Sequence, residues 1–339
     1  MKIQLIGLGN VGKNLLKLLS EEEEKLKDRG LDLRFVSISD SKGTAVNENG
    51  LKLSEVLKYK ELEWHNCTYY FKGYSAIDAI KNISSDIVVE LTPSTINGEP
   101  GLSHIKEAFM HKKHVVTANK GPLVVSFKKL KDMALENNLY FLYEATVAAH
   151  VPIFCLLSSC FITDEILKVE GIFNATTNFI ICEMEQGFSF QEALDKAIKA
   201  GWAETNYADD VDGIDAARKV VILANTIYDS DFKLDDVKIE GIRNVEPLIM
   251  EAKKQGKRVK LLCEIAKEGS GNVFLQVSPK VISQDNPFST VNYGDMAVKF
   301  YFKNSQEIFV SAKFVSPRQT AQAVLNDIIK VALNKKCKG

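Results

Sequence analysis

The sequence predicts an α/β fold in which a domain built on a parallel sheet is followed by an α+β domain. Three observations predict it: short apolar stretches typical of buried parallel strands, the polar loops that follow them, and segments of alternating polarity in the second half. A chain of 339 residues is long enough for two domains with a substantial core.

The chain opens with an apolar strand, residues 3–6, which runs directly into Gly-Leu-Gly-Asn-Val-Gly at residues 7–12. Leucines then recur along one side of a helix that we expect to begin near residue 11. In a dinucleotide site the first glycine allows a tight turn, the second lets pyrophosphate approach the backbone, and the third lets helix pack on strand. The pattern therefore predicts a Rossmann-type domain that binds NAD or NADP. Its cofactor residues would be Gly7, Gly9, Asn10, Val11 and Gly12.

A second predicted strand, residues 33–39, ends in Asp40. An acidic residue at this place commonly accepts the ribose hydroxyls of NAD. Ser41 and Lys42 follow it and could instead hold the extra phosphate of NADP. The sequence leaves the choice between NAD and NADP open.

Two further apolar strands, residues 86–91 and 114–117, each lead into a polar loop. Loops at the carboxyl ends of parallel strands surround the ligand in open α/β sheets. Thr92 lies in the first loop and Lys120 in the second. Lys120 is therefore placed where a cation could meet the nicotinamide or the substrate, although a lysine in a loop is more often a surface residue.

A polar stretch of the second half, from Glu204 to Lys219, holds several carboxylates and leads into a predicted helix. Asp215 and Lys219 stand four residues apart, so their side chains lie on one helical face. A carboxylate beside an ammonium can orient a small polar substrate and exchange a proton with it. The structural alternative makes Asp212 the helix N-cap and the Asp215–Lys219 pair a solvated ion pair of little consequence.

Composition is that of an ordinary globular protein: 45% of residues are hydrophobic, 26% are charged and the formal net charge is −1. Nothing in it favours binding to nucleic acid or to a membrane surface. The six cysteines are scattered, several of them in apolar contexts such as the one around Cys155, and have no metal-type spacing. We expect reduced, buried thiols in a cytoplasmic protein without a signal peptide or membrane span.

Four segments together resemble homoserine dehydrogenase: Val-Thr-Ala-Asn-Lys-Gly-Pro-Leu at 116–123, Glu-Ala-Thr-Val-Ala-Ala-His-Val at 144–151, Gly-Ile-Phe-Asn-Ala-Thr-Thr-Asn at 171–178, and the stretch from residue 200 to Lys219. The resemblance runs in order from residue 2 to about residue 329. It implies an NAD- or NADP-dependent interconversion of L-homoserine and L-aspartate 4-semialdehyde, a step toward threonine, methionine and isoleucine. A homodimer formed by the second domain is implied as well.

Matching motif positions imply roles for individual residues. Lys219 would handle the hydroxyl proton, with Lys120 as a second candidate acid or base. Asp215 is a third catalytic candidate, and the sequence leaves open which of the three transfers the proton. The substrate-binding residues would be Glu204, Asp210, Asp215 and Thr176. Thr92, Lys120 and Gly201 would line the cofactor. A monovalent cation, usually sodium in the family, would lie largely on backbone oxygens of Glu144, Val147, Ala149 and Val151.

Two segments depart from the family pattern. Residues 148–150, Ala-Ala-His, replace a glycine-rich run, and residues 314–321, Phe-Val-Ser-Pro-Arg-Gln-Thr-Ala, replace a glycine-rich loop that closes over the cofactor. We expect residues 1–140 and 318–335 to form the dinucleotide-binding domain and residues 141–317 the substrate and dimerisation domain. We expect a short, monofunctional form, because nothing in the sequence resembles an amino-kinase region or a regulatory domain.

Two other functions remain open at this point. One is a dehydrogenase of another small amino acid or semialdehyde; an aspartate semialdehyde dehydrogenase would need a nucleophilic cysteine, for which Cys155 is a poor candidate. The other is an NAD(P)-binding sensor that descends from a dehydrogenase. Retention of Asp215 and Lys219 argues against the sensor, whereas the altered loop at 314–318 favours it.

Overall fold

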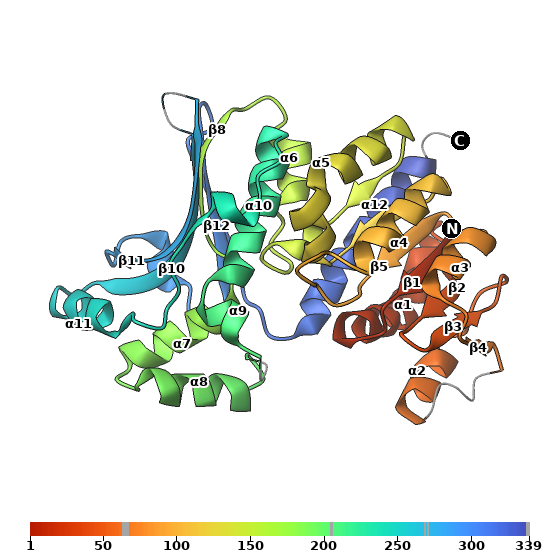
Figure 1. Cartoon of the computed structure of the whole chain (residues 1–339), viewed down its shortest axis with the longest axis horizontal. Coiled ribbons are helices and arrows are strands. Elements are labelled where there is room, and N and C mark those ends of the chain that lie inside the picture. The colour runs from red at the N-terminus through yellow and green to blue at the C-terminus, as the bar shows by residue number, and fades with distance from the viewer. Residues whose placement is uncertain (63–67, 204–205, 268, 270, 337–339) are drawn as a thin grey trace. The chain divides into compact units, whose positions relative to one another are not determined.

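The computed structural model describes residues 1–62, 68–203, 206–267, 269 and 271–336. The chain divides into two compact units (Figure 1). The first contains residues 1–149 and 316–339, and the second contains residues 150–315. The sequence placed these divisions at 140/141 and 317/318. Within the described parts of the chain, no helix is long and apolar enough to cross a membrane.

The first unit is built on a seven-stranded sheet of order β4-β3-β2-β1-β5-β6-β7. Its strands are β1 (Lys2–Ile6), β2 (Arg34–Ser39), β3 (Gly43–Val46), β4 (Tyr70–Lys72), β5 (Ile87–Glu90), β6 (His114–Thr117) and β7 (Phe141–Leu142). β1, β2, β5, β6 and β7 are parallel, and β3 and β4 pair antiparallel at one edge. The strand order reverses between β1 and β5, which makes the carboxyl ends of these two strands the switch point where α/β sheets bind ligands.

Helices cover both faces of this sheet: α1 (Asn10–Asp28), α2 (Leu53–Leu62), α3 (Ala76–Asn82), α4 (Gly101–Met110), α5 (Lys120–Glu136) and the last helix, α12 (Pro317–Lys336). α1 buries Leu15, Leu16, Leu18 and Leu19, as its leucine spacing predicts. α12 returns from the end of the chain to lie beside α1 (Figure 1). Apolar residues of both helices and of β1 form one core.

The second unit holds a six-stranded sheet of order β13-β12-β8-β10-β11-β9. Its strands are β8 (Ile166–Ile172), β9 (Lys238–Ile239), β10 (Arg258–Lys267), β11 (Val273–Ile282), β12 (Met296–Phe302) and β13 (Glu307–Ala312). All its pairings except that of β9 with β11 are antiparallel. The helices are α6 (Phe154–Cys160), α7 (Ala175–Glu185), α8 (Phe190–Lys199), α9 (Ala208–Val211), α10 (Ile214–Tyr228) and α11 (Glu246–Lys254). The α/β class with a Rossmann-type first domain is confirmed.

The cysteine expectation is partly wrong. Cys182 and Cys263 are buried and free, but Cys155 is half-buried and Cys160 is exposed. Both of the latter lie in α6, a seven-residue helix that buries none of its side chains within this chain. Local apolar sequence therefore did not predict burial here. Cys67 and Cys337 lie outside the described residues.

Candidate functional site

The glycine turn after β1 has the geometry that a dinucleotide requires. Gly7 has φ of +99°, and a Cβ there would lie 2.5 Å from the Leu91 carbonyl oxygen. A Cβ on Gly12 would lie 2.4 Å from the Gly7 carbonyl oxygen, so only glycine lets α1 come this close. Around Gly9 nothing lies within 4 Å of the Cβ position, which leaves space for a phosphate against the backbone. Asn10 and Val11 form the start of α1, where helix N–H groups favour an anion. The turn fits a dinucleotide.

Asp40 follows β2 and is held in place by its own loop. Its Oδ1 accepts hydrogen bonds from the backbone N–H of Lys42 at 2.8 Å and of Gly43 at 3.1 Å, and from the Tyr70 hydroxyl at 3.1 Å. Ser41 and Lys42 are exposed. The carboxylate is thus fixed at the end of the strand where a ribose would lie in a Rossmann-type domain.

Thr92 and Lys120 follow two neighbouring strands at the switch point. Thr92 lies two residues after the end of β5, and Lys120 is the first residue of α5, just beyond β6. Asn119 links the two loops: its side-chain amide donates to the Thr92 hydroxyl at 3.2 Å, and its side-chain oxygen caps α5 by accepting from the Gly121 N–H at 3.0 Å. The structure brings these two predicted residues to the same edge of the first sheet.

In the second unit, Asp215 and Lys219 form a close pair on α10. The Lys219 Nζ lies 2.6 Å from the Asp215 Oδ2 and donates to the Phe173 carbonyl oxygen at 2.5 Å. The two side chains are only 13% and 12% exposed. The pair is therefore largely buried, and a small part of each side chain is exposed to solvent. The alternative of a freely solvated ion pair is wrong.

Asn174 joins this pair to a second carboxylate. Its side-chain amide nitrogen donates to the Asp210 Oδ1 at 2.6 Å and to the Asp215 Oδ2 at 2.8 Å, while its oxygen accepts from the Thr177 N–H at 2.8 Å and caps α7. No functional role was predicted for Asn174. Asn before Ala-Thr-Thr signals a helix cap, but only the packed structure reveals the two carboxylates. We call Asn174, Asp210, Asp215 and Lys219 the carboxylate cluster.

Thr176 holds the loop that precedes the cluster. Its hydroxyl donates to the Trp202 carbonyl oxygen at 2.6 Å. Gly201 in this loop has φ of +76°, a left-handed conformation that favours glycine. Glu204, expected to bind substrate, lies outside the described residues.

Asp212 is not the N-cap of α10. The helix begins after Gly213, which has φ of 82° and is the N-cap residue without a side-chain cap. Asp212 instead forms a two-pronged ion pair with Arg243, and the Arg243 guanidinium lowers the pKa of the Asp212 carboxyl. Its partner lies 31 residues away in the chain, so the local pattern could not reveal it.

The expected cation segment begins in a short 3-10 helix, Glu144–Thr146, and Ala148 and Ala149 then adopt left-handed φ angles of 51° and 53°. Glu144 is buried, and its N–H donates to the Asp327 Oδ2 at 2.9 Å. Burial raises the pKa of Asp327 to about 7. Among the residues that the structure describes, no three His, Cys, Asp or Glu side chains group to hold a metal. A cation held by the described part of this segment would therefore depend on backbone oxygens and not on a group of side-chain ligands.

Among the cysteines that the structure describes, Cys263 lies beside the carboxylate cluster. Burial raises the pKa of its thiol to about 12, against an opposing effect of Lys219. A thiol held protonated in this way is a poor nucleophile. This disfavours a cysteine-based semialdehyde dehydrogenase.

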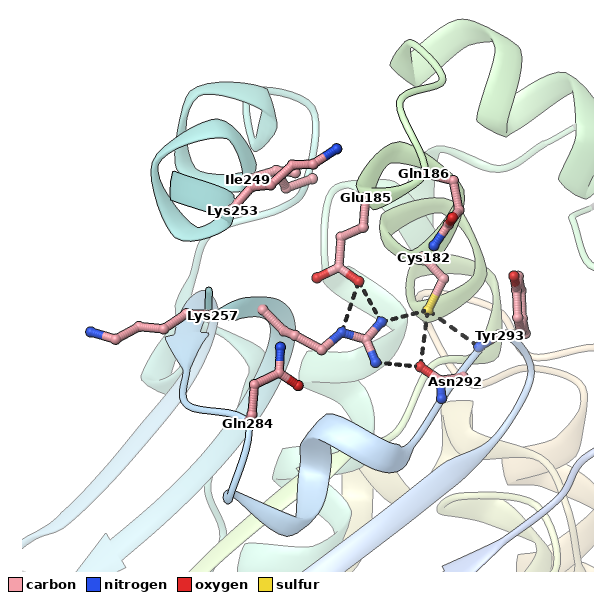
Figure 2. A pocket seen from close by; sticks show the side chains of 10 residues that line it. Cys182, Glu185, Gln186, Ile249, Lys253, Lys257, Gln284, Asn292 and Tyr293 are labelled. Atoms are coloured by element: carbon pink, nitrogen blue, oxygen red, sulfur yellow. Dashed lines mark hydrogen bonds and ion pairs between the residues drawn. The ribbon is translucent and has the colours of Figure 1, made fainter. Parts of the chain in front are cut away.

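A hollow of about 360 Å³ lies at the other end of α7. There Arg258 pairs with Glu185 and donates, at 2.6 Å, to the Asn292 side-chain oxygen (Figure 2). It also donates to the Ser289 carbonyl oxygen. Cys182 Sγ accepts from the Arg258 Nη2 at 3.8 Å and from the Tyr293 N–H at 3.3 Å. The guanidinium donors are thus turned onto protein acceptors, as expected for a structural network. We call Cys182, Glu185, Arg258, Lys260 and Asn292 the arginine network.

Comparison with known proteins gives a consistent result over both units. The family model described as "Homoserine dehydrogenase" matches residues 152–329, and "Homoserine dehydrogenase, NAD binding domain" matches residues 7–144. A homoserine dehydrogenase of Methanocaldococcus jannaschii is 38% identical over 336 residues, 98% of each chain. An NAD(+)-dependent homoserine dehydrogenase of Pseudomonas canavaninivorans is 32% identical, covering 97% of this chain and 96% of its own. The crystal structure of homoserine dehydrogenase from Thermoplasma acidophilum superimposes with a TM-score of 0.83 at 29% identity, covering 98% of this chain and 99% of its own.

Proposed function

This chain belongs to the homoserine dehydrogenase family, and from that premise we propose that the carboxylate cluster is where its substrate reacts. The enzyme is an NAD(P)-dependent oxidoreductase that converts the CH–OH group of L-homoserine to the aldehyde of L-aspartate 4-semialdehyde and back. The observation that carries the proposal is the Asn174 amide, which holds Asp210 and Asp215 beside the Lys219 ammonium.

Each residue of the cluster has a distinct task in this proposal. Homoserine carries an ammonium, which the Asp210 and Asp215 carboxylates bind by charge-assisted hydrogen bonds, together with Glu204. The Lys219 Nζ, as the neutral amine, takes the hydroxyl proton as the alcohol is oxidised, and the ammonium formed in this way returns the proton to the carbonyl oxygen in reduction. The nicotinamide supplies the hydride acceptor when it is bound. Lys120, at the start of α5, is the second candidate for the proton, and Thr176 keeps the loop around Gly201 in place.

The first unit supports cofactor binding by Gly7, Gly9, Asn10, Val11, Gly12 and Thr92. We propose NAD over NADP as the preferred cofactor. Asp40 presents a fixed carboxylate at the end of β2, where it accepts ribose hydroxyls and repels a 2′-phosphate. Asp40→Ser keeps an oxygen for the turn but removes the charge. It should raise the ratio of kcat/KM with NADP to that with NAD; an unchanged ratio would remove Asp40 from specificity.

We also propose a monovalent cation, sodium by preference, on backbone oxygens of Glu144, Val147, Ala149 and Val151. The support is chemical: Glu144 and Asp327 are both buried, and burial and then the charge of Glu144 raise the pKa of the Asp327 carboxyl, so a nearby cation would offset the repulsion between them. Exchange of sodium for a bulky organic cation at constant ionic strength should lower the thermal unfolding temperature. No change would count against the site.

A homodimer through the face of the second sheet that carries Lys168 is the form we propose in solution. On that face Lys168 lies 2.8 Å from Glu170 and 3.2 Å from Glu264, and Lys280 lies 3.1 Å from Glu264. Positively and negatively charged side chains alternate on this face. A second copy related by a two-fold axis therefore presents complementary charges to it. Sedimentation should give a dimer mass that Glu264→Lys lowers toward the monomer.

We also propose a cytoplasmic location, because the described cysteines form no disulfide.

The reaction is tested by the absorbance of reduced nicotinamide with L-homoserine, L-serine and L-threonine offered separately with NAD. Rapid reduction with L-homoserine alone supports the proposal. Reduction with L-serine or L-threonine instead would indicate a dehydrogenase of another small amino acid. Cofactor binding by calorimetry without turnover of any of the three would favour the sensor, to which the changed loop at 314–318 points.

A further inference from the structure

Glu90 is a fully buried carboxylate that the reaction described above does not use. It is the last residue of β5, the strand that pairs with β1 at the switch point, and it is 0% exposed. A carboxylate away from water is costly unless other groups compensate it. The groups around the Glu90 carboxylate therefore indicate its role.

Glu90 connects the two loops that follow β5 and β6. Its Oε1 accepts from the Thr92 N–H at 3.1 Å and from the Thr92 hydroxyl. The Thr117 hydroxyl donates to the Glu90 carbonyl oxygen at 2.8 Å and in turn accepts from the Asn119 N–H at 3.0 Å. Since Asn119 also binds the Thr92 hydroxyl, Thr92 and the start of α5 are tied to this one residue.

α4 closes the other side of the carboxylate. His104 is 7% exposed, and its Nδ1 lies 3.6 Å from the Glu90 Oε1. This Nδ1 has no hydrogen-bond partner among the described residues. Gly101 lets the helix come close, since a Cβ there would lie 3.1 Å from the Glu90 Oε2 and 2.5 Å from the Asn119 Nδ2. The carboxylate is enclosed by protein on the side away from the loops.

The position of Glu90 in the sheet indicates which part of the cofactor its charge acts on. The glycine turn after β1 takes the phosphates and Asp40 after β2 takes one ribose, so the nicotinamide half belongs to the β5–β6 side of the switch point. The oxidised nicotinamide ring carries a positive charge and the reduced ring carries none. A charge buried in protein acts over a longer distance than one in water.

We propose that Glu90 is a positioning residue whose carboxylate, acting with Thr92 and Asn119, makes the site favour the oxidised over the reduced nicotinamide dinucleotide. It fixes the loop that lines the nicotinamide and stabilises the ring's positive charge without touching the cofactor. This inference rests on the proposed dinucleotide site and adds a redox preference to it.

The test is the ratio of dissociation constants for NAD and NADH, measured by calorimetry and by NADH fluorescence on the full chain. Glu90→Gln keeps the shape and an acceptor for Thr92 but removes the charge. It should raise the dissociation constant for NAD relative to that for NADH on the order of tenfold. A purely structural Glu90 would weaken both forms equally, and an unchanged ratio with both forms bound overturns the inference.

Two further variants make the result independent of how well Glu90→Gln folds. Glu90→Asp retains the charge and should keep the ratio near that of the wild type. His104→Lys leaves Glu90 in place and puts a fixed cation beside it, so it should shift the ratio in the same direction as Glu90→Gln; an unchanged ratio here also overturns the inference. Wild-type protein that binds neither form would contradict the proposed function itself, before any variant is made.

Discussion

A lysine from another element lies near each end of α7, and the two lysines differ in burial and in their partners. At the N-terminal end, Lys219 lies 2.6 Å from the Asp215 carboxylate, and its side chain is 12% exposed. At the other end, Lys260 is 0% exposed and donates to the Asn178 Oδ1 at 3.0 Å, the Val291 carbonyl oxygen at 2.5 Å and the Cys182 Sγ at 3.5 Å.

The difference teaches how one helix can serve both chemistry and stability. A lysine with a carboxylate and an open edge can meet a substrate and pass a proton. A lysine enclosed among backbone and amide oxygens holds elements together instead, and burial lowers its pKa. We therefore expect changes at the carboxylate cluster to affect turnover and changes at the arginine network to affect unfolding.

The largest effect is expected from Lys219→Met, which removes the proton carrier but keeps a similar side-chain volume. The value of kcat should fall about a thousandfold, while the dissociation constant for NAD, measured by calorimetry, stays near the wild-type value. Equal losses in turnover and cofactor binding would contradict a role confined to proton transfer.

Asn174→Ser should come next, because serine can still cap α7 but cannot donate to both carboxylates. We expect kcat/KM for L-homoserine to fall on the order of tenfold to a hundredfold. Asn286→Ser is the matched control, since Asn286 caps the 3-10 helix Pro287–Thr290 in the β11–β12 connection and serine can replace it there as well. If both variants lose activity alike, the exchange of a capping asparagine for serine, and not the placement of the carboxylates, explains the result.

Lys260→Met should leave kcat within a few-fold but lower the free energy of unfolding by about 2 kcal/mol at neutral pH, because Asn178 and Val291 lose a donor. The folded pKa of Lys260 lies below its unfolded value of 10.5. The unfolded state therefore binds more protons between these two values, and the wild type gains stability relative to the variant as pH rises toward 10.5. Denaturant unfolding at neutral and alkaline pH checks the sign, and a falling difference would contradict it.

Cys182→Ser should have the smallest effect. The sulfur lies in the hollow of Figure 2 and accepts from the Tyr293 N–H and from Lys260. The serine hydroxyl can accept the same hydrogen bonds, but its bond to Cβ is shorter than that of the sulfur, so the hydrogen bonds become longer. We expect a loss of stability under about 1 kcal/mol and an unchanged kcat. A large loss of activity would mean that the arginine network acts on the site through α7.

The same comparison explains what the sequence could predict. The glycine turn at residues 7–12, the buried strands and the Asp215–Lys219 pair are local patterns, and they predict the first sheet and one half of the carboxylate cluster. Asn174 and Lys260 depend on contacts between segments far apart in the chain, 36 residues in the case of Asn174 and Asp210. Asp212 shows the reverse error, since a local cap pattern is overruled by the distant Arg243.

Chemical rescue tests the role of Lys219 most directly. Lys219→Ala removes the amine and leaves room for a small primary amine beside Asp215. We predict that added ethylamine restores a measurable part of the L-homoserine-dependent formation of NADH in Lys219→Ala, in proportion to the free amine, and does not do so in Lys260→Ala. A Lys219→Ala rate that ethylamine leaves unchanged, in protein that still binds L-homoserine and NAD, would contradict the proton-transfer role.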